Sequence, residues 1–145
     1  MRKNIVATIY PLLAMALMSM AASTFAHHSA AGYDLDATDT AQATLKEFRW
    51  TSPHAALVFV IKGPNGQPQE ITLGGASPGK FSRQGFKPKD FKVGDKIEVT
   101  WHPARNGRPG GILATIKFPD GRLYKDDTVD ALKTINDNHF KGDEP

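Results

Sequence analysis

Residues 56–73 read ALVFVIKGPNGQPQEITL, and this stretch gives the clearest indication of secondary structure in the chain. Its first seven residues are rich in β-branched and aromatic side chains, which favour strands. The run GPNG at residues 63–66 contains the residue types that tight turns select. Apolar and polar residues alternate again after the turn, so the stretch predicts a β-hairpin with strands over residues 56–62 and 69–73.

Alternation of apolar and polar residues, rather than helical spacing, continues on both sides of this hairpin. Residues 40–50 predict a long first strand that bends, with Leu45 on one face and Phe48 on the other. Residues 96–101 and 112–118 predict two further strands after the hairpin. The chain is therefore expected to be mainly β.

One short helix is expected over residues 77–85. Ser77 is suited to the N-cap, Pro78 to the first helical position and Gly85 to the C-terminal stop. Phe81 is the large apolar residue of this segment, so we expect it to fill the core.

The expected order is a long bent strand, a hairpin, a short helix and two more strands, which is the order of an OB-fold-like five-stranded barrel. The predicted fold class is all-β, and a small β-sandwich built from the same strands is the alternative. We place the barrel domain at residues 39–125. Residues 126–145 predict a weakly helical or disordered C-terminal tail.

The first 26 residues have the layout of a secretory signal peptide. Arg2 and Lys3 are followed by an apolar run over residues 5–20 and then by small residues up to Ala26. We expect cleavage after Ala26, with an earlier cut and an uncleaved N-terminal anchor as alternatives. The predicted location is periplasmic or secreted, and residues 27–38 form an irregular leader ahead of the barrel.

Cleavage changes the charge balance of the chain. It removes two of the 18 basic residues and none of the 15 acidic ones, which leaves a net charge of +1. A chain so close to neutral lacks the electrostatic support that nucleic-acid binding needs. Because the sequence has no cysteine, disulfides and Cys-type zinc sites are excluded as well.

Cleavage after Ala26 would make His27 the N-terminal residue, with His28 next to it. A terminal histidine offers its amine and its ring nitrogen on one chelating unit. Imidazole-rich sites suit Cu, Zn or Ni better than Mg or Ca. We therefore expect a transition-metal site, with copper as the first candidate and Zn or Ni as alternatives; a solvent-exposed terminus without metal is the competing interpretation.

His54 and His102 are the other candidate metal ligands. In an OB-type barrel the loop between strands one and two and the loop between strands four and five flank the usual binding region. We expect His54 and His102 on those two loops, where they could share a metal with His27 or His28. Alternatively, His54 makes only a local hydrogen bond and His102 merely ends a strand.

Trp50 and Trp101 lie near strand ends and could form a stacking platform for a small ligand. Large aromatic residues at strand ends also close the cores of small barrels, which is the preferred interpretation. No serine, histidine and acidic residue group into a nucleophile set, so the sequence favours a binding protein over an enzyme. The alternatives to a metal-binding protein are a non-metal ligand or envelope interaction module and a copper oxidase.

Two motifs resemble those of an uncharacterised family of exported bacterial proteins, a domain of unknown function. They are HHS at residues 27–29 and WTSPHA at residues 50–55. The resemblance continues through GASP at 75–78, VGD at 93–95 and WHPA at 101–104, and so covers nearly all of the chain after the signal. It implies export and a small β domain, without an established activity. Members typically carry an aromatic residue where this chain has Ala56.

Overall fold

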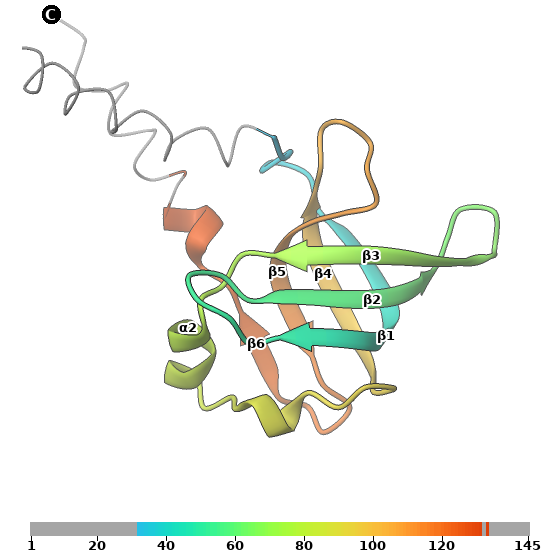
Figure 1. Ribbon diagram of the computed structural model, residues 1–145. Helices are drawn as coiled ribbons and strands as arrows, with labels where there is room; N and C mark the ends of the chain where they lie inside the picture. The colour runs from blue at the N-terminus through green and yellow to red at the C-terminus, as the bar shows by residue number, and fades with distance from the viewer. Residues whose placement is uncertain (1–31, 132, 134–145) are drawn as a thin grey trace, which may run out of the picture. The chain divides into compact units, whose positions relative to one another are not determined.

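The computed structural model describes residues 32–131 and residue 133. Its elements, in chain order, are β1 (Asp39–Arg49), β2 (Ala56–Lys62), β3 (Pro68–Gly74), α2 (Pro78–Arg83), the 3-10 turn η2 (Pro88–Asp90), β4 (Lys96–Pro103), β5 (Gly110–Lys117) and β6 (Leu123–Lys125). The strands form one sheet in the order β3-β2-β1-β4-β5-β6 (Figure 1). None of the helices in this part of the chain has the length and apolar character that crossing a bilayer takes.

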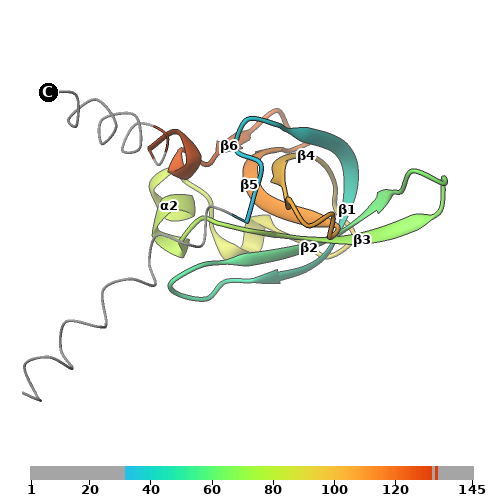
Figure 2. The same ribbon diagram turned by 90° about the horizontal axis from the view of Figure 1, so that it is seen from above.

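The sheet closes into a five-stranded barrel because β3 also pairs with β5, in parallel. Thr72 lies opposite Gly110 and Gly74 opposite Ile112, and Figure 2 shows the closed ring of strands from above. Gly110 is required at this seam: its φ is +108°, and a Cβ there would lie 2.3 Å from the carbonyl oxygen of Thr72. The closure confirms the predicted all-β, OB-fold-like barrel.

Strand β1 bends as expected, but its faces differ from the prediction. The pairing with β2 shifts register between Leu45 and Glu47, which marks a β-bulge. A bulge inserts one extra residue and reverses which face the following residues occupy. Phe48 therefore lies opposite Leu57 and packs against the same core as Leu45, whereas alternation alone placed Phe48 on the other face.

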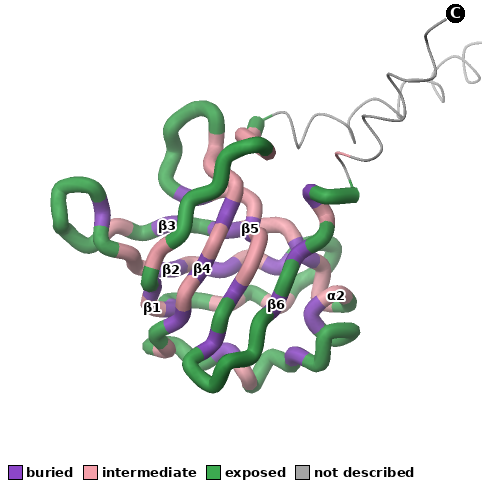
Figure 3. Tube along the Cα trace, turned by 180° about the vertical axis from the view of Figure 1, so that it is seen from behind, coloured by how far each residue is buried: buried purple, intermediate pink, exposed green. Residues whose placement is uncertain are grey.

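Helix α2 closes one end of the barrel. Ser77 caps it by accepting a hydrogen bond from the Lys80 N–H, and Phe81 is fully buried, as predicted. The Phe81 ring stacks on Tyr124 of β6, with 4.1 Å between ring centroids. Figure 3 shows how buried and half-buried residues alternate along the strands around this core.

Several boundaries differ from the sequence-based expectations. β4 extends to Pro103 and β5 begins at Gly110, so the two strands form a longer hairpin than predicted. β6 was not predicted, because a strand of three residues is too short to show the alternation of apolar and polar residues. Residues 128–131 are helical.

Candidate functional site

Strand pairings connect the two candidate histidines of the barrel around its wall. His102 pairs with Ile112, and Ile112 pairs with Gly74. Gly74 in turn pairs with Ala56, two residues after His54. Neighbouring strands lie about 4.8 Å apart, so the three pairings place Ala56 about 15 Å from His102 along the wall.

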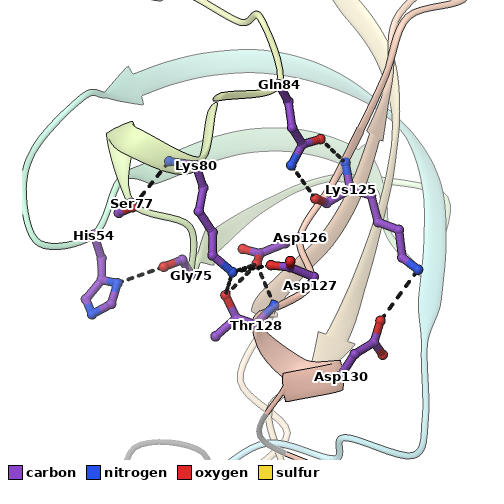
Figure 4. A network of polar contacts seen from close by, with 10 residues as sticks. All are labelled: His54, Gly75, Ser77, Lys80, Gln84, Lys125, Asp126, Asp127, Thr128 and Asp130. Atoms are coloured by element: carbon purple, nitrogen blue, oxygen red, sulfur yellow. Dashed lines mark hydrogen bonds and ion pairs between the residues drawn. The ribbon is translucent and has the colours of Figure 1, made fainter. Parts of the chain in front are cut away.

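His54 lies in the loop between β1 and β2 and is exposed. Its Nδ1 donates a hydrogen bond to the carbonyl oxygen of Gly75, 2.7 Å away (Figure 4). The next residue reinforces this contact, since Ala55 N donates to Ala76 O at 2.9 Å. In the neutral ring, this bond places the proton on Nδ1 and leaves the lone pair on Nε2.

His102 lies within β4 rather than on the loop that follows it, so the predicted loop position was wrong. The neighbouring Trp101 faces the core, and His102 faces outward because successive side chains of a strand alternate. Its Nδ1 donates to the carbonyl oxygen of Ala37 at 2.9 Å. Like His54, it thus presents Nε2 as a free acceptor.

The end of the leader is held beside His102. Tyr33 forms a β-bridge with Ala104, and Asp34 N donates to Pro103 O at 2.8 Å. Arg105 adds two contacts: its Nε donates to Tyr33 O at 2.9 Å, and its Nη2 lies 3.7 Å from Asp34 Oδ1. The segment that leads back to His27 and His28 therefore starts next to His102.

The described residues do not contain a complete metal site. Among residues 32–131 and 133, no three His, Asp or Glu side chains gather closely enough to hold an ion. His27 and His28 lie outside the described residues. The four-histidine site therefore remains a prediction.

Trp50 and Trp101 lie at opposite ends of β1. Trp101 pairs with Asp39, the first residue of the strand, and Trp50 follows its last residue. Trp50 packs near α2, with its ring centroid 5.6 Å from that of Phe81. The structure thus does not bring the two indoles together into one platform.

Trp101 is 5% exposed and lines a pocket at the barrel end away from α2. The pocket has a volume of about 250 Å³. Its walls come from the start of β1, from β3 and from the loop between β4 and β5. The lining residues are Asp39, Gln69, Ile71, Trp101, Pro103, Ala104, Gly107, Arg108, Pro109 and Gly110.

Comparison with protein families gives one match. The model of a family of unknown function (DUF6152) matches residues 14–114, which is more than two thirds of the chain. The chain belongs to this family. The match confirms the resemblance to a domain of unknown function, and comparisons with curated proteins and with solved structures find no match.

The region matched by the DUF6152 model includes both barrel histidines and the residues that hold the leader, but ends before β6. Asp126, Asp127 and Thr128, which follow this region, belong to a polar cluster that the sequence-based reasoning missed (Figure 4). The side chain of Asp126 is fully buried, and its Oδ1 accepts from Thr128 N at 2.9 Å and from Thr128 Oγ1 at 2.5 Å. The sequence DDT at residues 126–128, an Asx motif at a helix start, is the signal that could have revealed it.

Lys80 of α2 completes this cluster. Its Nζ lies 3.4 Å from Asp126 Oδ1, donates to Thr128 Oγ1 at 2.8 Å and forms an ion pair with Asp127. The hydrogen bond from Lys80, followed by its charge, lowers the pKa of the Asp127 carboxyl below its ordinary value. Burial, with a further contribution from the charge of Asp126, raises the pKa of Tyr124. The cluster fastens the C-terminal segment to α2.

Proposed function

We propose that this chain is an exported β-barrel protein that binds a transition metal at His102 together with His27 and His28. Copper is the first candidate, and Zn or Ni are the alternatives. Signal cleavage after Ala26 would expose His27 as an N-terminal chelating unit beside His28. The observation that carries the proposal is the position of Tyr33 and Asp34, at the end of the leader, beside the strand that carries His102.

The state of the His102 ring supports this function. A histidine that binds a metal through one ring nitrogen usually donates its other N–H to a carbonyl or carboxylate, which orients the ring. The bond from His102 Nδ1 to Ala37 O has this form. Nε2 therefore needs no change of tautomer to accept a metal ion.

The length of the leader also supports metal binding by His102 together with His27 and His28. Tyr33 pairs with Ala104, two residues after His102. His28 precedes Tyr33 by five residues, which span at most about 17 Å when extended. The N-terminal histidines can therefore reach the His102 ring without moving the barrel.

His54 is the least favourably placed of the four predicted ligands. Two imidazoles bound to one metal ion have their nitrogens within about 4 Å of each other, because each bond is about 2 Å long. The path along the wall from His102 to Ala56, two residues after His54, is about 15 Å, and the His54 ring is bonded to Gly75 at the far end of that path. We therefore propose that His54 does not bind the ion held by His102, and that His54→Ala weakens copper binding less than His102→Ala.

The test uses the chain expressed with its signal and purified in the exported form. Native mass spectrometry before and after one equivalent of Cu(II) should show a chain that begins at His27 and retains one copper ion. His102→Ala should lose the copper, whereas His139→Ala, in the C-terminal tail, should keep it. A mature chain that starts elsewhere, or one that retains no copper, contradicts the proposal.

A chemical modification separates terminal chelation from ordinary imidazole binding. The N-terminal amine has a lower pKa than lysine, so it can be acetylated selectively near neutral pH while both imidazoles remain. If the amine and ring bind copper together, acetylation should reduce the affinity for Cu(II) by roughly tenfold or more. Unchanged affinity would contradict the N-terminal chelate.

A further inference from the structure

We propose that the pocket beneath the β4–β5 loop binds a small zwitterion of the α-amino acid class, with Arg108 holding its carboxylate and Asp39 its ammonium group. This site is separate from the histidines, and the proposal does not rest on metal binding.

The pocket combines two opposite charges that the described residues leave unpaired. Asp39 and Arg108 both line it. Within residues 32–131 and 133, neither side chain has a hydrogen-bond or ion-pair partner, and the two do not form an ion pair with each other. A ligand with one positive and one negative group can satisfy both, whereas a simple anion or cation would meet one unfavourable charge.

The other surface hollows differ in this respect. In the hollow of about 520 Å³ beside η2, Arg122 lies 3.5 Å from Asp90 and 2.8 Å from Asp120, so these two carboxylates already have a cation beside them. In the hollow of about 430 Å³ over β1 and β4, Gln42 donates to Glu98 at 3.0 Å. The pocket lined by Asp39 and Arg108 contains a carboxylate and a guanidinium group that described residues leave unpaired.

The floor and the volume of the pocket suit a small, partly apolar ligand. Ile71 is 2% exposed and Trp101 5% exposed, so they form an apolar floor, and an indole face also attracts an ammonium group. The volume of about 250 Å³ lies below the range of about 300–1,000 Å³ that is usual for drug-sized ligands. A ligand of several heavy atoms fits these limits.

The loop that carries Arg108 is held by its own hydrogen bonds. Ala104 N donates to Gly110 O at 3.2 Å, and Gly107 N donates to Ala104 O at 3.1 Å. Arg108 N donates to Asn106 Oδ1 at 3.1 Å. The backbone at Arg108 is thus ordered before a ligand arrives, which reduces the entropy cost of binding.

The test is isothermal titration calorimetry of the exported chain against each standard L-α-amino acid. At least one should bind with a Kd below about 1 mM. The C-terminal amide and the N-acetyl derivative of the best ligand should each bind at least roughly tenfold more weakly, because each lacks one charge. If no amino acid binds, or if either derivative binds as well as its parent, the proposal is overturned.

Two arginines of the same loop provide a matched pair of variants. Arg108→Met should weaken binding of the best amino acid by roughly tenfold or more, and Asp39→Asn should do the same. Arg105→Met should leave the affinity unchanged, because Arg105 contacts the leader and does not line the pocket. Circular dichroism confirms that each variant is folded. Equal loss in the two arginine variants, or loss in neither, would overturn the assignment.

Discussion

Gln84 pairs with the main chain of Lys125 through both ends of its amide. Its Nε2 donates to the Lys125 carbonyl oxygen at 2.7 Å, and its Oε1 accepts from the Lys125 N–H at 3.1 Å (Figure 4). A single side chain thus makes the two hydrogen bonds that a neighbouring strand would make to Lys125. It covers part of the outer edge of β6, and a covered edge is less available for pairing with another chain.

We predict that Gln84→Ala lowers the free energy of unfolding by about 1 kcal/mol, since two hydrogen bonds in an exposed position are lost. Urea denaturation measures the change, and amide exchange at Lys125 should become faster. Gln42→Ala is the matched control: it removes one side-chain bond on the surface, to Glu98, and should change the stability by less than about 0.5 kcal/mol. An unchanged exchange rate at Lys125 would show that Gln84 does not protect this edge.

Lys80→Met should destabilise the fold by about 2–4 kcal/mol, because it leaves the fully buried Asp126 carboxylate without its cation. Chemical denaturation at pH 7 measures this loss. Lys46→Met is the control. Lys46 pairs with Glu70 on the surface, where both side chains are more than half exposed, so little change is expected.

The effect of Lys80→Met should depend on pH. Lys80 lowers the pKa of Asp127 in the folded state, so the unfolded chain binds the proton more readily. The stabilisation from this pair is therefore complete above the ordinary carboxyl pKa of about 4 and is lost as the pH falls below it. The stability difference between the parent chain and Lys80→Met should shrink from pH 5 to pH 3. A difference that stays constant over this range would refute the coupling.

Gly110→Ala should weaken the closure of the barrel. The added Cβ would lie 2.3 Å from Thr72 O at a φ of +108°, so β3 and β5 would have to move apart. We expect a loss of at least about 3 kcal/mol in the free energy of unfolding. Gly107→Ala, in the same loop, keeps a positive φ of +73° but has open space around it, and should cost about 1 kcal/mol. Similar losses for both variants would mean that the backbone conformation, rather than the contact with Thr72, limits position 110.

Arg105→Met should weaken Cu(II) binding by roughly threefold to tenfold if the leader must be held beside His102. Arg105 is a positioning residue here: it binds Tyr33 O and lies near Asp34, without reaching the histidine ring. Competition titration against a chelator of known affinity measures the change. Arg108→Met should leave copper affinity unaltered, which is the reverse of its effect on amino-acid binding. Equal copper affinity in both variants would show that holding the leader is unnecessary.

The candidate site was only partly predictable. His54 and His102 stood out in the sequence because imidazoles with turn-forming neighbours suggest ligands at loops. The bonds that fix their tautomers go to Gly75 and Ala37, which lie 21 and 65 residues away in the chain. No local pattern encodes such partners. Arg105 and Arg108 were not singled out from the sequence, because only the fold places Arg105 against the leader and Arg108 in a pocket.

The sequence by itself determined the strands of the hairpin, the turn at residues 63–66 and the helix capped by Ser77, because each follows from neighbouring side chains and their local conformational preferences. Their order also determined the barrel class. Only the tertiary structure decided the bulge after Leu45, the parallel seam of β3 and β5 and the buried Asp126 cluster. These features depend on packing and hydrogen bonds between residues far apart in the chain, where closure of the barrel outweighs local alternation.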